Sequence, residues 1–413
     1  MAEKERSNRS IVRGLGRNVI LLGVVSLLAD VSSEMVNPLI PIYLTTALLA
    51  SPEVIGIVSG AADSTGNLVK VLTGWYSDKI RKRKAFIAIG YTPTAVVKPL
   101  MALITAWPQM LAIRITDRAG KGIRTAPRDA LLIDSVTVEK RGAAFGLHRG
   151  MDSAGAIIGT TMSILLLLFL AGVAENDTIK IIFILSSIPA FLSVLVVILF
   201  VKESESKTTQ PSKAVSFRES LMAADPRLKR FLVIVAMIGF ANVGYTFLVL
   251  RAYDFGAGLM EVLFIYLAMN VTYTLFSFPA GIVSDKIGRK RMIAVGLLIF
   301  ISGALIMAIA SSILVLLMGF LVYGTFLAVI DVNESTFASM LSKKSDRGTI
   351  MGAYHTVNGI VALPAGFLFG LIWSSFGDSG PLAAFGYVSV VAAISLVMLM
   401  IFIAEPKDNA QSS

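Results

Sequence analysis

The sequence has no cysteine and little charge, and both shortages exclude classes of protein. None of its 413 residues is cysteine, which rules out disulfide bonds and thiolate chemistry. Two histidines argue against a histidine metal site, and we expect neither a metal nor another cofactor. Charged residues make up 15% of the chain, whereas a soluble protein carries roughly 25%. The composition therefore argues against a protein surrounded by water.

Apolar segments take the place of the missing charge. Hydrophobic residues make up 55% of the chain, and its mean hydropathy is +0.76. Stretches of about 20 residues, the length that crosses a bilayer, follow one another from Val19 to Ala404. The first 17 residues are polar and basic, and the first apolar run lacks the features of a cleavable signal. The sequence predicts an all-α, polytopic membrane protein.

We expect twelve transmembrane helices in two groups of six. Residues 18–201 should form an N-terminal six-helix bundle, and residues 227–404 a C-terminal one. Residues 202–226 should form a polar linker with a short amphipathic helix. Residues 1–17 and 405–413 should be tails. The first span should be broken at Pro38 and Pro41, and the seventh should run over residues 227–253.

Lysine and arginine are missing from every loop on one side of the predicted membrane. Of the 37 basic residues, 27 lie in the even-numbered loops and tails, ten lie within or at the ends of spans, and none lies in the other loops. The positive-inside rule then places both termini in the cytoplasm and the protein in the cytoplasmic membrane. The net charge of +10 is assigned to this topology, and we expect no nucleic-acid partner.

The two halves of the sequence repeat each other. Residues 281–291 repeat the pattern of residues 74–84 at an offset of 207. A second match, at an offset of 206, places Arg141-Gly142 and Asp152 over Arg347-Gly348 and Asn358. Both halves start on the same side and cross six times, so the repeats are parallel.

The repeated loop resembles the signature loop of the major facilitator superfamily of transporters, in particular its proton-coupled exporters. The pattern Gly-x-x-x-Asp-Lys/Arg-x-Gly-Arg-Lys/Arg-Lys/Arg is complete in the second copy, whereas the first has Arg81 in place of glycine. The first loop is therefore expected to be shaped differently. In the family this loop latches the two halves together. The resemblance implies a cytoplasmic latch anchored by Asp78 and Asp285, to which we add Gly74, Arg128, Asp129, Gly281 and Arg289.

Two further motifs of the family are present in part. Arg118-Ala-Gly-Lys-Gly in span four is similar to Arg-x-x-Gln-Gly, with lysine for glutamine. Gly155 and Gly159 in span five keep two glycines of the antiporter motif but not its proline. The resemblance therefore favours export by antiport without establishing it.

Span four carries a stripe of charge. If it is helical, Arg114, Asp117, Arg118, Lys121, Arg124 and Arg128 fall within one arc of about 120°. A bare charge at mid-bilayer costs at least about 2.5–3.5 kcal/mol, so the stripe must face a water-filled cavity or paired carboxylates. The resemblance puts spans one, four, seven and ten around a central cavity. For this cavity we predict Asp63, Arg114, Lys121, Arg124, Arg149, Asp152 and Asn242, the last echoing Asp30 in an Ala-x-Val pattern.

Asp30, Glu34 and Arg118 are the candidates for proton coupling. Counted from the helix ends, Glu34 is level with Arg118, Asp30 with Lys121, and Asp152 with Arg124. Two carboxylates one turn apart cannot both stay ionised cheaply, so one of them can carry a proton beside an arginine. The alternative is a structural lattice of charges that keeps the N-terminal half rigid.

The predicted function is secondary active transport by alternating access. We expect a proton-coupled monomer in the lipid bilayer that moves a small amphipathic or anionic solute, with export favoured. An uptake symporter for an organic anion is the alternative, because arginines bind carboxylate and phosphate. A transporter-shaped sensor would need a folded soluble domain, for which the tails and linker leave no room. An enzyme is not expected, since no nucleophile–base pattern or phosphate-binding loop occurs.

Cysteine labelling tests the predicted topology. The chain has no native cysteine, so a single cysteine placed within residues 203–215 reports on that segment alone. It should react with a membrane-permeant maleimide but not with an impermeant one added to intact cells. Labelling by the impermeant reagent would contradict the twelve-span arrangement.

Overall fold

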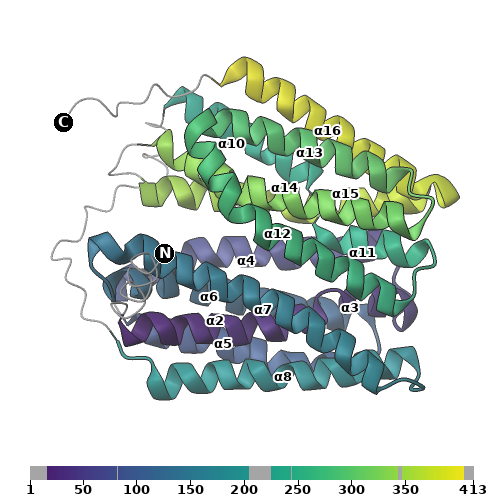
Figure 1. Ribbon diagram of the computed structural model, residues 1–413, viewed down its shortest axis with the longest axis horizontal. Helices are drawn as coiled ribbons and strands as arrows, with labels where there is room; N and C mark the ends of the chain where they lie inside the picture. Colours follow the sequence, from purple (N-terminus) through teal and green to yellow (C-terminus); the bar gives the residue numbers. More distant parts are fainter. Residues whose placement is uncertain (1–15, 81, 204–224, 243, 343–346, 404–413) are drawn as a thin grey trace, which may run out of the picture. The chain divides into compact units, whose positions relative to one another are not determined.

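The computed structural model describes residues 16–80, 82–203, 225–242, 244–342 and 347–403. The predicted tails and the amphipathic part of the linker fall almost entirely outside these ranges. Within them all regular secondary structure is helical, which confirms the all-α fold (Figure 1).

The helices of the first half correspond to the first six predicted spans. They are α2 (Arg17–Val36), α3 (Leu39–Thr46), α4 (Pro52–Ile80), α5 (Arg83–Leu100), α6 (Trp107–Asp134), α7 (Arg141–Phe169) and α8 (Glu175–Phe200), with short 3-10 turns at Met101–Leu103 and Val138–Lys140.

The helices of the second half follow the same plan. They are α10 (Pro226–Ala241), α11 (Tyr245–Asp254), α12 (Leu259–Ile287), α13 (Arg289–Ala308), α14 (Ile313–Met340), α15 (Arg347–Ser375) and α16 (Gly380–Phe402), with a 3-10 turn at Gly377–Ser379.

Twelve helical segments are long enough to cross a bilayer. In the described part of the chain, ten of them are also apolar enough to be recognised as membrane spans by composition. The other two are α4, with 29 residues, and α6, with 28 residues, which carry more charge. The protein is therefore a multi-pass membrane protein whose two most charged spans are α4 and α6.

The helix bounds reproduce the internal repeat. Both ends of α6 and α14 are separated by 206 residues, and so are the starts and the ends of α7 and α15. For α4 and α12 the separation is 207 residues at both ends. The two pseudo-symmetric halves inferred from short motifs therefore extend over whole helices.

Both the first and the seventh spans are broken. Asn37 and Pro38 separate α2 from α3, as expected from a proline that has no backbone N–H to donate. The break predicted at Pro41 is wrong, because Pro41 lies within the first turn of α3, where a missing N–H costs little. The break between α10 and α11 was not expected from the sequence. It follows Asn242 and includes Gly244, whose φ of 74° is a left-handed conformation that glycine adopts readily.

Contacts divide the chain into two compact units. The first unit comprises Met1–Ile40 and Leu68–Pro211, and the second comprises Pro41–Asn67 and Ser212–Ser413. The division differs from the predicted bundles because the start of α4 packs tightly on α15. A Cβ on Gly366 would lie 2.5 Å from the carbonyl oxygen of Gly56, so the two backbones touch. Small residues permit such contacts between membrane helices.

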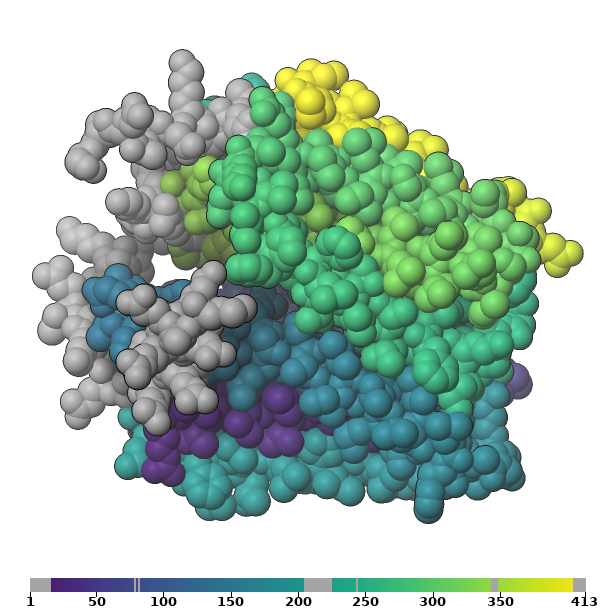
Figure 2. Space-filling view, in the orientation of Figure 1, coloured from purple at the N-terminus to yellow at the C-terminus, as the bar shows by residue number. Residues whose placement is uncertain are grey.

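In the first unit, α2 packs against α7 and α8, and its apolar side chains contribute to the core. Val19, Leu22 and Val25 are buried in one cluster with residues of α5, α6, α7 and α8. On the face shown in Figure 2, side chains fill the spaces between neighbouring helices of this unit. The contact between α2 and α7 is close at Gly159, where a Cβ would lie 2.4 Å from the carbonyl oxygen of Val31.

Replacing Gly159 with alanine should therefore destabilise the protein. The added methyl group forces α2 and α7 apart, and overpacking of this kind costs roughly 1–3 kcal/mol. The measurement is the thermal unfolding midpoint of the purified protein in detergent, which should fall.

Gly150→Ala is the matched control on the same helix, because a Cβ there meets no atom within 4 Å. Its midpoint should stay the same or rise slightly, since alanine favours a helix over glycine. Equal midpoints for the two variants would show that the close contact at Gly159 is not needed for stability.

Candidate functional site

A chain of polar contacts joins α2 to α6 at the break in the first span. Nη1 of Arg114 donates to Oδ1 of Asn37 over 3.4 Å, and Nδ2 of Asn37 donates to Oε1 of Glu34 over 2.8 Å. Arg114 also forms an ion pair of 3.7 Å with Asp117, one turn along α6. Glu34, predicted to lie level with Arg118, thus reaches α6 through Asn37 and Arg114.

Lys98 places a cation deep inside the first unit. It lies on α5 with 0% of its surface exposed. Its Nζ donates to the hydroxyl oxygens of Ser32 and Ser33 on α2, over 2.6 Å and 3.2 Å. The hydroxyl oxygens accept hydrogen bonds from Lys98 but carry no negative charge. The carboxylate with the largest electrostatic effect on Lys98 is that of Asp117.

Arg124 is held by neutral groups of α5. Its Cζ lies 4.2 Å from the ring centroid of Tyr91, which is a cation–π contact. Its Nη1 donates to Oγ1 of Thr94 over 3.0 Å and to the carbonyl oxygen of Gly90 over 3.3 Å. The depth count had placed Arg124 level with Asp152, but the groups that hold it are these three.

The buried charges of α5 and α6 do not balance. Lys98, Arg114 and Arg124 are all buried, and Asp117 is the carboxylate buried with them. Buried charges are stable only when they are paired or well hydrogen-bonded. We call these four residues the buried cluster. Taken alone, the cluster therefore carries a surplus of positive charge.

Asp30 and Glu34 border this cluster from α2, and both side chains are half-buried. The charged groups that act most strongly on Asp30 are Asp152, Lys121 and Glu34. Lys121 is exposed, although it lies in the middle of the 28-residue helix α6, and Arg118 beside it is half-buried. A lysine at that depth cannot face lipid cheaply, so we infer aqueous surroundings for this face of α6.

A histidine–aspartate pair on α7 faces the same region. Nδ1 of His148 lies 3.4 Å from Oδ2 of Asp152. Nε2 of His148 is buried and has no hydrogen-bond partner in the described part of the chain. Gly155, three residues further on, lets α7 approach α2, since a Cβ there would lie 3.0 Å from Cβ of Asp30. The pair thus lies on the stretch of α7 that packs against Asp30.

Other predicted residues of the first half are not members of the buried cluster. Near the end of α6, Nη2 of Arg128 pairs with Asp129 at 2.9 Å and Nη1 donates to Ser26 over 3.2 Å. Arg149 is exposed on α7. Asp63 is exposed on the part of α4 that belongs to the second unit.

The second copy of the signature loop forms a connected set of contacts. Arg289 pairs with Asp285 and donates from Nη1 to Oδ1 of Asn333 on α14 over 3.2 Å. Gly288 between the two helices has a φ of 95°, which explains why the pattern has glycine at this position.

The first copy can be compared only in part. Arg81 and the side chain of Asp78 lie outside the described residues, so the predicted difference in loop shape stays a prediction. Gly74 faces Ala126 of α6 and Gly281 faces Val332 of α14, with distances from a Cβ of 3.4 Å and 3.9 Å. The two glycines therefore occupy equivalent places in the repeat.

Asn242 marks the break in the seventh span. The hydroxyl of Tyr323 on α14 donates to its Oδ1 over 2.8 Å. The Ala-x-Val pattern compared Asn242 with Asp30, but the helix ends align it with Asn37, which likewise follows the last residue of its helix. The comparison with Asp30 is therefore out of register. Both asparagines contact the helix that crosses the membrane fourth in their half.

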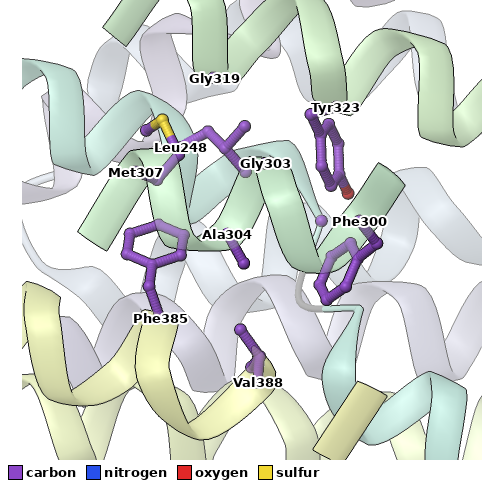
Figure 3. A pocket seen from close by; sticks show the side chains of 10 residues that line it. Leu248, Phe300, Gly303, Ala304, Met307, Gly319, Tyr323, Phe385 and Val388 are labelled. Atoms are coloured by element: carbon purple, nitrogen blue, oxygen red, sulfur yellow. The ribbon is translucent and has the colours of Figure 1, made fainter. Parts of the chain in front are cut away.

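Next to Tyr323 the second unit has a small apolar pocket (Figure 3). Its lining comes from α11, α13, α14 and α16 and the break before α11: Gly244, Leu248, Phe300, Gly303, Ala304, Met307, Gly319, Tyr323, Phe385 and Val388. Among the described residues, Tyr323 is the one ionisable group in this lining. Apart from the hydroxyl group of Tyr323, the lining of this pocket is therefore apolar.

Sequence reasoning missed the partners that hold the charged residues. Asn37, Ser32, Tyr91 and Lys98 were not among the predicted site residues. Tyr91 and Lys98 stand two turns apart on α5, on the same helical face, which was a usable signal. No group of three or more acidic, histidine or cysteine side chains that could hold a metal occurs among the described residues.

Replacing Asp117 with asparagine should destabilise the protein strongly. The variant removes the carboxylate that pairs with Arg114 and leaves three buried cations, and breaking a buried pair costs roughly 3–5 kcal/mol. Thermal unfolding in detergent measures the loss. Asp129→Asn on the same helix is the control, because its carboxylate is 37% exposed and its loss should cost much less. A smaller loss for Asp117→Asn than for Asp129→Asn would contradict the buried cluster.

Comparisons with known proteins address the whole chain. The sequence profile of the Major Facilitator Superfamily matches residues 22–270 and 231–413. An uncharacterized MFS-type transporter of Methanocaldococcus jannaschii is 35% identical over 403 residues, which cover 96% of this chain and 97% of that protein.

Solved structures share the fold at low sequence identity. A D-xylose–proton symporter has a TM-score of 0.78 and 14% identity, covering 94% of this chain and 98% of its own. The nucleoside transporter NupG has a TM-score of 0.73 and 15% identity, with coverage of 94% and 98%.

Proposed function

Because the chain belongs to the Major Facilitator Superfamily, we propose that it is a secondary active transporter that couples proton movement to the movement of a small anionic or amphipathic solute. Membership of the family and the fold of its transporters support transport. Proton coupling, the class of solute and the direction of transport are the added proposals. The protein is proposed to act as a monomer in the cytoplasmic membrane, with both termini in the cytoplasm, and not as an enzyme.

One observation carries the proposal for the solute. Lys98, Arg114 and Arg124 are buried in a membrane-spanning bundle with Asp117 as their buried carboxylate. An anion entering beside them would supply the missing negative charge, and arginine suits carboxylate and phosphate groups. Lys121 is exposed on the same helix and provides a first contact from the aqueous side. The solute should therefore carry at least one negative charge.

Coupling is assigned to Asp30 and Glu34. Both carboxylates are half-buried at the border of the buried cluster. The charge of a solute bound at the cluster would therefore change their electrostatic surroundings. Arrival of an anion near Arg118 and Lys121 weakens the hold of these cations on the carboxylates. The anion and the carboxylates thus compete for the same cations, and each exchange changes how tightly a carboxylate holds its proton, so solute binding and proton binding become linked.

Gating is assigned to the signature loops. Asp285, Arg289 and Asn333 form one connected set at the junction of α12, α13 and α14. We propose that this set, together with Asp78 in the first copy, stabilises one conformation of the transporter. Arg128 and Asp129, which pair near the end of α6, are proposed to belong to the same gate.

Export by antiport is the direction proposed, because Gly155 and Gly159 keep the glycines of the antiporter motif and both pack directly on α2. Uptake of an organic anion with protons is the second candidate, favoured by the same positive surplus. The two differ in whether solute and protons move in opposite directions or together.

Variants of the two carboxylates test the coupling. Asp30→Asn and Glu34→Gln remove the ionisable groups and keep their size. At least one variant should still exchange solute at equal pH on both sides of a proteoliposome and lose its response to an imposed pH gradient.

Asp177→Asn is the control, since its carboxylate is 61% exposed and pairs with Lys180 one turn along the same helix. Its flux should follow the gradient as the unmodified protein does. A normal gradient response in both Asp30→Asn and Glu34→Gln would place coupling elsewhere and leave this pair with a structural role.

A further inference from the structure

Glu334 on α14 is a buried carboxyl group without a cation in the described part of the second unit. Its residue is 5% exposed. The hydroxyl of Tyr354 on α15 donates to Oε2 over 2.7 Å. The other oxygen, Oε1, is buried and has no hydrogen-bond partner among the described residues. This is unusual, because buried polar atoms nearly always have a hydrogen-bond partner.

The charged groups around Glu334 are engaged elsewhere. Arg289 of α13 is bound by Asp285 and Asn333. Asp331, one turn earlier on α14, is exposed and accepts from Tyr273 of α12. Among the described residues, the ionisable groups on α15 and α10 nearest in sequence to these contacts are Tyr354 and His355 of α15 and the exposed Lys229 and Arg230 of α10, where Phe231 packs on Phe337. Lys286 of α12 and Lys290 and Arg291 of α13 lie beside Asp285 and Arg289 in the signature loop.

The internal repeat shows what is unusual about this site. At the offset of 206, Glu334 corresponds to Arg128, Tyr354 to His148, and Asn358 to Asp152. In the first unit these places hold a cation, an imidazole and a carboxylate, so charges can compensate one another. In the second unit two of the three side chains are neutral. At the equivalent positions, therefore, no opposite charge compensates a negative charge on the carboxyl group of Glu334.

An ionised carboxylate without a cation is among the least favourable groups to bury, and a neutral carboxyl group avoids that cost. We propose that Glu334 is a proton-binding site of the second unit, neutral in this conformation and distinct from Asp30 and Glu34. When the unit rearranges and water reaches the group, its O–H bond breaks, leaving a carboxylate and releasing a hydrated proton. Rebinding of a proton restores the neutral group.

Asn358 of α15 lies between this site and the last turn of α10, which precedes the break in the seventh span. Nδ2 of Asn358 donates to the carbonyl oxygen of Tyr354 over 3.3 Å. Asn358 also borders α10, since a Cβ on Gly239 would lie 3.8 Å from its Oδ1. Gly239 precedes Asn242 by one helical turn. Movement at the break can therefore change the surroundings of Glu334. That its proton is linked to solute flux rests on the proposed function; that it binds a proton does not.

Infrared spectroscopy of the purified, reconstituted protein tests the assignment directly. A neutral carboxyl group gives a carbonyl stretching band that a carboxylate lacks. At neutral pH the difference between the spectra of the unmodified protein and Glu334→Gln should contain one such band. Asp331→Asn is the matched control on the same helix and should leave that band in place.

Tyr354→Phe provides a second readout that does not depend on Glu334→Gln folding. Loss of the tyrosine hydroxyl removes the hydrogen bond to Oε2, so the band should shift in frequency and persist. A spectrum without this band at neutral pH, or a band unchanged in Glu334→Gln, would overturn the proposal. Because no solute is needed, failure here is distinguishable from failure of transport or of coupling at Asp30 and Glu34.

Discussion

Charge inside a membrane must be neutralised or hydrated, and this constraint explains most of the structure around α6. Lys98 donates hydrogen bonds to serine hydroxyls, and Arg124 stacks on an aromatic ring. Arg114 pairs with Asp117 and donates to Asn37. None of these arrangements removes the net positive charge of the buried cluster. We propose that the first unit thereby keeps an electrostatic preference for an anion. We regard that preference as the physical basis of its proposed selectivity.

The two halves use the same helices for different chemistry. The repeat preserves helix lengths, the break after an asparagine and the glycines that face α6 and α14. It does not preserve charge, because Tyr323 in the second unit stands where the first unit has Asp117 at the same offset. The second unit contributes an apolar pocket, the Asp285–Arg289 pair and the buried Glu334. Duplication thus kept the geometry while the two units diverged in electrostatics.

The sequence predicted the architecture well because long apolar runs and a repeated loop are signals that each half carries independently. It predicted which side chains are charged but not what holds them. Asn37, Ser32 and Tyr91 come from separate helices, and no spacing along the chain shows that Arg114, Lys98 and Arg124 meet them. The break after Asn242 was missed because Gly244 alone is a weak signal within an apolar run. Asn242 was aligned with Asp30 on a three-residue pattern, although the longer motifs repeat at an offset of 206 or 207.

The most direct test of the central claim is solute flux into proteoliposomes containing the unmodified protein, with and without an imposed pH gradient. A panel of organic anions, neutral metabolites and organic cations should be compared under both conditions. The account predicts that anionic or amphipathic solutes are moved, that the gradient accelerates their movement, and that protons move in the opposite direction. Gradient-driven flux restricted to cations or neutral solutes, or anion flux that ignores the gradient, would contradict it.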